Sequence, residues 1–232
     1  MVWWDPRYFL FVGPAVLLAI YASFKVKSTF ARAKEMMTRR GWTGRDVAQA
    51  ILDSEGIHDV AIEPVNSYLG DHYDPRHRVL RLSPDVYHGR SIAAAGVAAH
   101  EVGHAIQHAQ GYAALSLRNS IVPLASIGSN LSLILIMIGL AMTLQPLAIL
   151  GCALFTMVVL FQVINLPVEF NASTRARQAL LANGLVTEVE DKEVGRVLRA
   201  AAMTYVAATL TAILTLLYYL WRAGLLGGHR DE

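Results

Sequence analysis

The string His-Glu-Val-Gly-His at positions 100–104 has the residue types and spacing that most directly imply chemistry. On a helix, His100 and His104 leave the same face about one turn apart. Two imidazoles at that separation can reach one tetrahedral zinc ion. Glu101 lies within about 100° of both around the helix, so it is placed to accept a proton from a zinc-activated water as the water attacks a carbonyl. The string therefore predicts one catalytic Zn²⁺ with Glu101 as general base.

The helix expected around this string runs from Ile92 to His108 and is rich in alanine. The alternative is a helix whose histidines are merely exposed or capped. Buried histidines and a glutamate on so apolar a helix would be costly without partners, which favours the metal site. Gly103 lowers helix stability without adding packing, which again favours a functional reason for the string.

The elements that must position this helix include four long apolar runs. The composition of the chain agrees with these runs crossing a membrane. Apolar residues make up 54% of the chain and charged residues 16%, against about 45–50% and 25% in soluble domains. We expect a mainly α membrane protein with four transmembrane helices, of which the second and third are joined by a tight turn at Gln145-Pro146. The expected spans are residues 8–24, 121–144, 147–166 and 203–221.

Basic residues orient these spans. They are concentrated in the two polar segments, residues 25–120 and 167–202, which the positive-inside rule places in the cytoplasm. The amino terminus and the turn at 145–146 are then outside. Because basic residues follow the first run, it is expected to remain as an anchor, since a cleaved signal peptide has the reverse asymmetry.

The segment 25–120 is expected to form a small α+β catalytic segment that contains the HEVGH helix. Two short alternating stretches, residues 59–65 and 78–82, predict strands of a hairpin or small sheet. The residues between them, 66–77, have the composition of a loop. The second strand is a candidate for binding an extended peptide by edge addition.

A third zinc ligand is expected from Glu169, since catalytic zinc commonly has three protein ligands. Two membrane crossings separate Glu169 from His104, so it returns to the same side of the bilayer. Pro167 suits the first turn of a helix beginning there; the alternative role of Glu169 is an interfacial carboxylate at that helix start. Four further acids on this side form a polar cluster expected to be a solvated helix start or turn: Glu188, Glu190, Asp191 and Glu193.

The strings HEVGHAIQ (100–107) and LPVEFNAS (166–173) closely resemble the bacterial family of YugP-type neutral zinc metallopeptidases. Residues 66–75 and 82–84 share that resemblance, which covers nearly the whole chain. The sequence is more distantly similar to the HtpX-type and CAAX prenyl membrane proteases, which combine His-Glu-x-x-His with a glutamate in Glu-(Phe/Tyr)-x-Ala-Asp. Ser173 departs from that string, because the relatives have an aspartate there that supports the site.

The resemblance implies a gluzincin-like zinc metalloendopeptidase in the bacterial cell (inner) membrane, with its active site on the cytoplasmic face. Two alternatives remain. A site-two-type intramembrane protease would take its third ligand from an Asp inside a later span, and the later apolar runs contain no acid. A catalytically inactive membrane scaffold retaining a metal site would usually fill all four positions with protein ligands, and no fourth ligand is evident.

The partners expected are a peptide or membrane-protein substrate and the lipid bilayer. A regulatory or substrate-presenting membrane partner would suit a protease exposed at the cytoplasmic face. Nucleic acid is not expected, because the net charge is only +2 and no basic stripe carries interleaved aromatics. Cys152, the single cysteine, excludes an internal disulfide. No spacing selects an oxyanion donor among His72, Tyr73, His77, Tyr87 and His88, and His108 is expected to be a helix-end residue.

Overall fold

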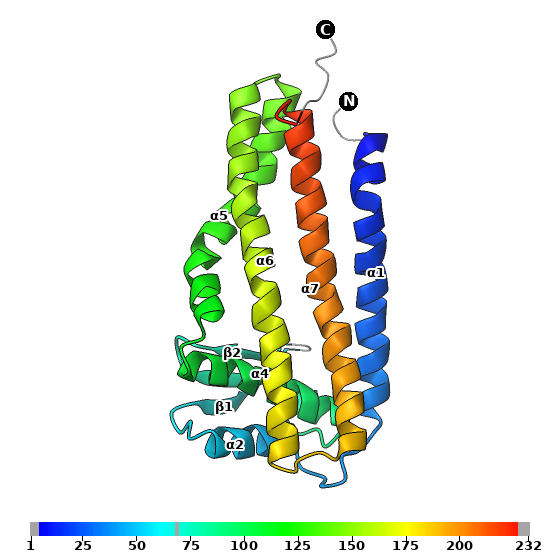
Figure 1. Cartoon of the computed structure of the whole chain (residues 1–232), viewed down its shortest axis with the longest axis vertical. Helices are drawn as coiled ribbons and strands as arrows, with labels where there is room; N and C mark the ends of the chain where they lie inside the picture. Colours follow the sequence, from blue (N-terminus) through cyan, green and yellow to red (C-terminus); the bar gives the residue numbers. More distant parts are fainter. Residues whose placement is uncertain (1–4, 68–69, 227–232) are drawn as a thin grey trace. The chain divides into compact units, whose positions relative to one another are not determined.

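The computed structural model describes residues 5–67 and 70–226, so two positions of the family-like stretch 66–75 lie outside the described residues. The fold is mainly helical with one small sheet (Figure 1). In chain order the elements are α1 (Pro6–Lys34), α2 (Gly44–Ser54), β1 (Ala61–Pro64), β2 (His72–Asp74), β3 (Val79–Leu82), α3 (Pro84–Tyr87), α4 (Ile92–Ala109), α5 (Ala113–Ala141), α6 (Gln145–Ala182) and α7 (Glu188–Arg222).

Four of these helices, α1, α5, α6 and α7, are long and apolar enough to cross a membrane, with mean hydropathies between 1.8 and 2.5 over their most apolar stretches. The expected apolar runs lie in these helices, which confirms a mainly α membrane protein. The helices extend beyond the runs, however, and α5 ends at Ala141, before the expected boundary at 144. The turn between α5 and α6 is therefore formed by residues 142–144 instead of Gln145-Pro146.

Pro167 does not begin a helix, contrary to expectation, because it lies inside α6. Proline lacks the amide hydrogen that would bond the carbonyl one turn earlier, so it weakens the helix at one point. Helix α6 nevertheless continues through it to Ala182, and Glu169 belongs to the interior of a long helix.

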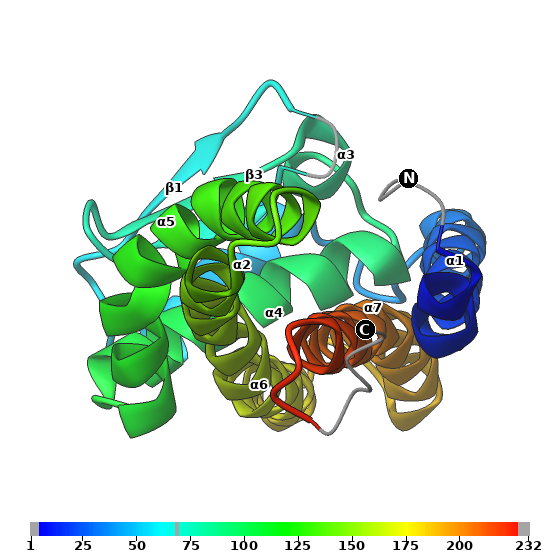
Figure 2. The same cartoon turned by 90° about the horizontal axis from the view of Figure 1, so that it is seen from above.

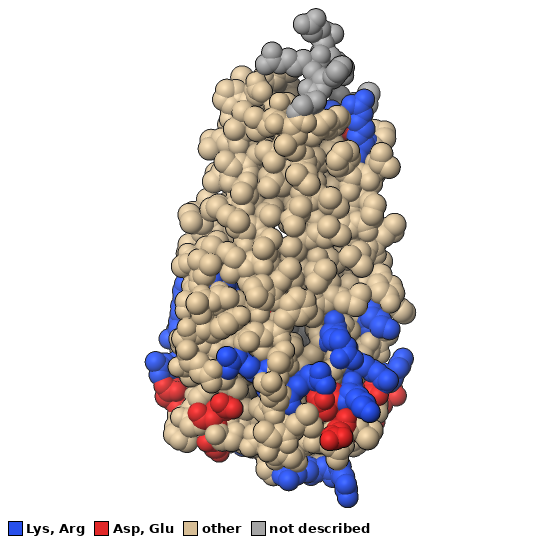
Figure 3. Space-filling model, viewed as in Figure 1, with Lys and Arg blue, Asp and Glu red and all other residues tan. Residues whose placement is uncertain are grey.

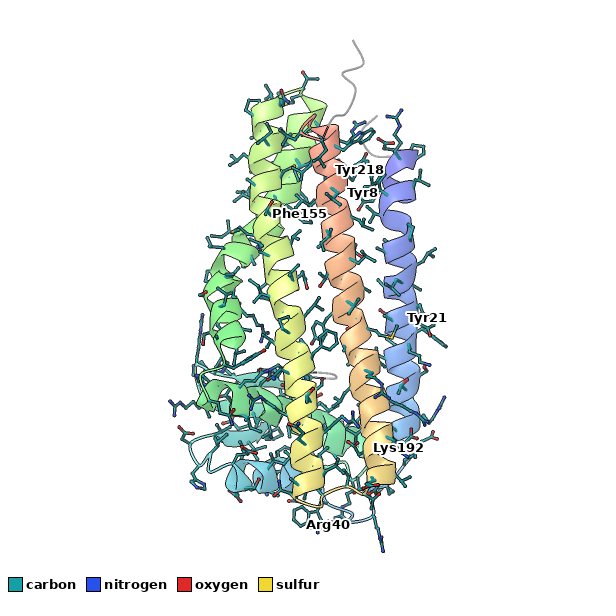
Figure 4. All side chains as sticks on the ribbon, viewed as in Figure 1. Tyr8, Tyr21, Arg40, Phe155, Lys192 and Tyr218 are labelled. Atoms are coloured by element: carbon teal, nitrogen blue, oxygen red, sulfur yellow. The ribbon has the colours of Figure 1, made fainter. Side chains whose placement is uncertain are left out.

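The chain forms two compact units, and each of the four long helices, α1, α5, α6 and α7, contributes residues to both. Among the described residues, the helical unit comprises 5–22, 117–166 and 204–226. Its α5 and α6 are in close contact, since a Cβ atom at Gly151 would lie 2.7 Å from the backbone nitrogen of Ile136. Tyr8 of α1 contacts Tyr218 of α7, with ring centroids 5.1 Å apart (Figure 4). The visible face of this unit has few charged side chains (Figure 3).

The α/β unit comprises residues 23–116 and 167–203. Its core is built by buried aliphatic residues of α2, β3 and α4 together with the parts of α6 and α7 in this unit. The sheet has the order β1-β3-β2, and it packs with α2 and α4 (Figure 2). Strands β1 and β3 are parallel, whereas β2 and β3 are antiparallel.

Of the two expected arrangements, a hairpin or a small sheet, the structure confirms the small sheet, because β1 and β3 are parallel and do not form a hairpin with each other. Two other expectations are corrected. The segment read as a loop, 66–77, contains the third strand, β2. Strand β3 is central and paired on both sides, so it has no free edge to which a peptide could be added.

Candidate metal centre

Helix α4 carries the HEVGH string in its second half. Its start is fixed by Ser91, whose hydroxyl accepts a hydrogen bond from the amide nitrogen of Ala94 at 3.2 Å. The helix expected from residue 92 to 108 is thus present and ends one residue later, at Ala109. His100 and His104 leave the same face of it, with ring centroids 4.9 Å apart and the rings nearly perpendicular.

Glu169 reaches these rings from α6, within the same α/β unit. Its carboxylate is buried, and its Oε2 atom lies 3.3 Å from His100 Nε2 and 3.8 Å from His104 Nε2. The three potential ligand atoms all lie within 4.8 Å of one another. Among residues 5–67 and 70–226, this is the one group of three or more potential metal ligands gathered so closely.

Two acids of the competing cluster have partners elsewhere in the α/β unit. Glu190 accepts hydrogen bonds from the backbone amides of Arg39 and Thr187, the second of which fits a cap at the start of α7. Asp191 forms a two-point ion pair with the Arg177 guanidinium, with contacts of 2.9 and 2.5 Å. These contacts account for both side chains without a metal.

Gly103 determines how closely α4 and α6 approach beside the site. A Cβ atom at this position would lie 2.5 Å from the backbone oxygen of Ala172. The expectation that Gly103 adds no packing is therefore wrong, because its missing side chain allows the close approach. Ala172 lies between Glu169 and Ser173 in α6, so the same approach brings both of those side chains to the histidines.

Gln107 fixes the orientation and the tautomer of His104. The carboxamide of Gln107 is fully buried, and its nitrogen donates to the Val168 carbonyl at 2.8 Å and to Asn171 Oδ1 at 2.9 Å. Its oxygen lies 3.0 Å from His104 Nδ1. Because both amide hydrogens are used, the oxygen must accept from Nδ1–H. The lone pair of the neutral imidazole is then on Nε2, facing Glu169.

Ser173 contacts the Nδ1 atom of His100, as Gln107 contacts that of His104. Its hydroxyl oxygen lies 3.2 Å from His100 Nδ1, so it can accept a hydrogen bond from that nitrogen and leave Nε2 free. The serine that departs from the Glu-(Phe/Tyr)-x-Ala-Asp string therefore still contacts a histidine of the HEVGH string. It is a neutral acceptor where the relatives' pattern has a charged one.

The electrostatics of this group fit a cation. The Oε2 atom of Glu169 is buried and accepts no hydrogen bond from the described residues, which is uncommon for a buried carboxylate oxygen. Burial alone would lower the pKa of His104, but the neighbouring carboxylates of Glu169 and Glu101 raise it above its ordinary value. The same negative potential would stabilise a metal ion. Two imidazole nitrogens and one carboxylate oxygen are a donor set that zinc accepts.

Glu101 is held by the neighbouring strand. Its side chain is largely buried, and its Oε2 atom accepts a hydrogen bond from the backbone amide of Tyr73 in β2 at 3.1 Å. The Tyr73 hydroxyl lies 2.8 Å from His108 Nδ1, so the tyrosine is joined to α4 at two points about two turns apart. Strand β2, unexpected from the sequence, thus positions the predicted general base.

Of the five residues considered as oxyanion donors, Tyr73 is the one that contacts the HEVGH string within the described part of the chain. His72 and His77 are exposed, and the second pairs with Asp74 at 2.7 Å. His108 bonds to Tyr73 instead of joining the metal-ligand group, as suits a residue near the helix end.

Sequence reasoning missed three features of the site. Gln107 lies three residues after His104, which places both side chains on the same face of the helix. This spacing could have predicted the contact between the amide and the imidazole. The close approach at Gly103 and the amide of Tyr73 had no such signal, because both depend on which segment the fold places opposite α4.

Comparisons with known proteins cover nearly the whole chain. Residues 8–224 match the model of a family described as "Putative neutral zinc metallopeptidase". The chain is also 47% identical over 212 residues to "Putative membrane protease YugP" of Bacillus subtilis (strain 168), a match that covers 91% of this chain and 94% of that protein. No solved structure matches the chain significantly.

Proposed function

Because this chain belongs to the family described as "Putative neutral zinc metallopeptidase", we propose that it is a membrane-embedded zinc metalloendopeptidase. The observation that carries the proposal is the convergence of His100, His104 and Glu169. Glu101, on the same helix, supplies a carboxylate beside them that is not part of the ligand group. The side chains that meet in the fold thus come from the two strings, HEVGHAIQ and LPVEFNAS, on which the resemblance to the family rests.

In this proposal His100 and His104 would hold one zinc ion through their Nε2 atoms, and Glu169 would hold it through its carboxylate. Three protein ligands leave one position for solvent or substrate, as in catalytic zinc sites. When bound there, zinc would lower the pKa of a water molecule to about 7 and polarise the substrate carbonyl.

Glu101 is proposed to accept a proton from the attacking water and to deliver it to the amine that leaves when the peptide C–N bond breaks. The hydrogen bond from the Tyr73 amide supports this role, because it fixes one carboxylate oxygen through rigid backbone. The second oxygen is then presented in a defined direction. A carboxylate held in this way loses little freedom when the water binds.

The proposed substrates are peptides or membrane proteins, and the proposed location of the site is the cytoplasmic face of a bacterial cell membrane. Both rest on the sequence. The relative from Bacillus subtilis is named a membrane protease, and the basic residues of this chain are concentrated in the segments that form the α/β unit.

Glu101→Gln tests the proposed chemistry. The amide keeps the size of the side chain and still accepts a hydrogen bond from Tyr73, but it cannot take a proton from water. General-base catalysis contributes about 10²- to 10⁴-fold to the rate, so peptide hydrolysis by the purified protein should fall by at least about 100-fold. Zinc content should remain near that of the wild type.

The matched control is Glu55→Gln, an exposed glutamate of the same unit that ends α2; it should change neither rate nor zinc content. Glu101→Gln retaining most of the activity would refute the general-base role. A wild-type protein that binds zinc but hydrolyses no peptide, with or without added zinc, would favour the inactive scaffold.

A further inference from the structure

A second site lies between the parts of α6 and α7 that belong to the α/β unit. It is an open cavity of about 420 Å³, lined by residues of α6 between 170 and 181 and of α7 between 191 and 202. None of its walls comes from α4, so it is distinct from the candidate metal centre. The two sites share Ser173, which lines the cavity and contacts His100.

Two arginines meet in this cavity. A Cβ atom at Gly195 would lie 3.1 Å from Arg177 Cζ and 3.1 Å from Arg199 Nη1, so both guanidinium groups occupy the space that a side chain there would fill. Asp191 pairs with Arg177 and balances one charge. Arg199 has no ion-pair partner among the described residues, and like charges this close repel. The cavity therefore has an uncompensated positive charge and would gain from an anion.

The rest of the lining combines apolar residues with three polar ones, Ser173, Thr174 and Gln178, and two of the apolar residues lie at one end. Phe170 and Ala202 lie where α6 and α7 adjoin the expected membrane spans, and both line the cavity. Arg177 lies about two turns further along α6. The Arg199 side chain reaches back to Gly195, again away from the span. The cavity thus has an apolar end toward the spans and a cationic end away from them.

We propose that this cavity binds the headgroup of an anionic phospholipid, with the phosphate between Arg177 and Arg199 and the first acyl carbons on Phe170 and Ala202. The planar guanidinium of Arg199 can give phosphate oxygens two parallel hydrogen bonds, whereas Arg177, whose Nε and Nη2 atoms bond Asp191, would contribute its remaining nitrogen. Basic side chains gather over this part of α7 (Figure 3), as is typical of segments that attract anionic lipid surfaces. A free phosphate would use only the cationic end, whereas a lipid uses both.

The test measures binding of short-chain lipids to the full-length protein in neutral detergent by native mass spectrometry or calorimetry. The probes are dihexanoyl phosphatidylglycerol, dihexanoyl phosphatidylcholine and inorganic phosphate. Phosphatidylglycerol should bind at least about tenfold more tightly than phosphatidylcholine, whose choline offsets the phosphate charge. Arg199→Gln should weaken phosphatidylglycerol binding about tenfold, the effect of one charge-assisted hydrogen bond.

Arg199 is exposed and its replacement leaves no buried acid unpaired, so the variant should fold. Gly195→Ala is a second variant, because it displaces both guanidinium groups and should also weaken binding. The matched control is Arg196→Gln, which removes the same charge from an exposed neighbour outside the cavity and should leave binding unchanged.

Three results would overturn the proposal. Equal affinity for the two lipids would show that the anionic headgroup is not recognised. If Arg196→Gln weakened phosphatidylglycerol binding as much as Arg199→Gln does, the binding would depend on general surface charge and not on this cavity. Competition by inorganic phosphate at the same concentration as the lipid would make a free anion the occupant.

Discussion

The Nδ1 atoms of His100 and His104 are both engaged inside the α/β unit, the first by the Ser173 hydroxyl and the second by the Gln107 carboxamide. Each contact orients a ring and leaves the Nε2 lone pair toward Glu169. Such outer contacts typically change metal affinity by about 10- to 100-fold. The arrangement of the two rings therefore uses side chains that the HEVGH string itself does not contain, Ser173 and Gln107.

At the residue scale, zinc content tests whether Glu169 is the third ligand. Glu169→Ala should lose both zinc and peptide hydrolysis, because it removes one of three proposed ligands. Zinc affinity should fall by more than about 100-fold, beyond the effect of losing an outer contact. Metal analysis after dialysis against a weak chelator gives the measurement.

The matched acid is Glu190, which bonds the amides of Arg39 and Thr187. Glu190→Ala should cost about 1 kcal/mol of stability, as the loss of a helix cap does, while zinc content stays normal. Normal zinc in Glu169→Ala, together with loss in Glu190→Ala, would mean that the third ligand has been misassigned.

At the scale of elements, the site depends on α4 crossing α6 with no side chain between Gly103 and Ala172. The helices themselves could be predicted, since long apolar runs and helical spacing are local signals. Strand β2 could not, because its three residues are polar and its pairing with β3 is not local. The continuation of α6 through Pro167 was also missed, since proline usually marks a helix boundary and neighbouring helices can override it.

The crossing predicts a difference between two glycines of α4. Gly103→Ala places a methyl group against backbone, which cannot move aside easily, and should lower the free energy of unfolding by about 1–3 kcal/mol, as overpacking does. It should also weaken zinc binding, because it separates Glu169 from the histidines. Thermal unfolding and zinc titration in detergent measure the two effects.

Gly96→Ala is the control on the same helix. The nearest neighbour of its methyl group would be the side chain of Val194, at 3.2 Å, and alanine stabilises a helix relative to glycine by about 1 kcal/mol. Stability should therefore change little, and zinc binding should not change. Equal behaviour of the two variants would show that the close approach at Gly103 is not required.

For the whole molecule, four spans and two basic polar segments imply an orientation. The segments 25–120 and 167–202 contribute nearly all residues of the α/β unit, and together they contain most of the basic residues of the chain. An even number of crossings between them is needed to bring Glu169 to the histidines, and α5 and α6 provide two. The four apolar helices could be predicted because apolar length is a property of composition along the chain. The orientation stays a prediction from charge asymmetry.

Reporter fusions test the orientation. A reporter placed after Leu144, in the turn between α5 and α6, should behave as external, whereas one placed after Asn183 should behave as cytoplasmic. Alkaline phosphatase, which is active outside, and a fluorescent protein that matures inside give opposite readouts. The reverse pattern would put the candidate metal centre on the outer face and change the proteins available as substrates.

One zinc ion per chain, bound by His100, His104 and Glu169, is the claim on which the proposed activity rests. X-ray absorption at the zinc edge of the purified protein tests it most directly, since it reports both the amount of metal and the atoms around it. We expect about one zinc per chain with two imidazoles, oxygen ligands and no sulfur. Protein that stays free of zinc when zinc is supplied, or a spectrum showing sulfur or a single imidazole, would contradict the claim.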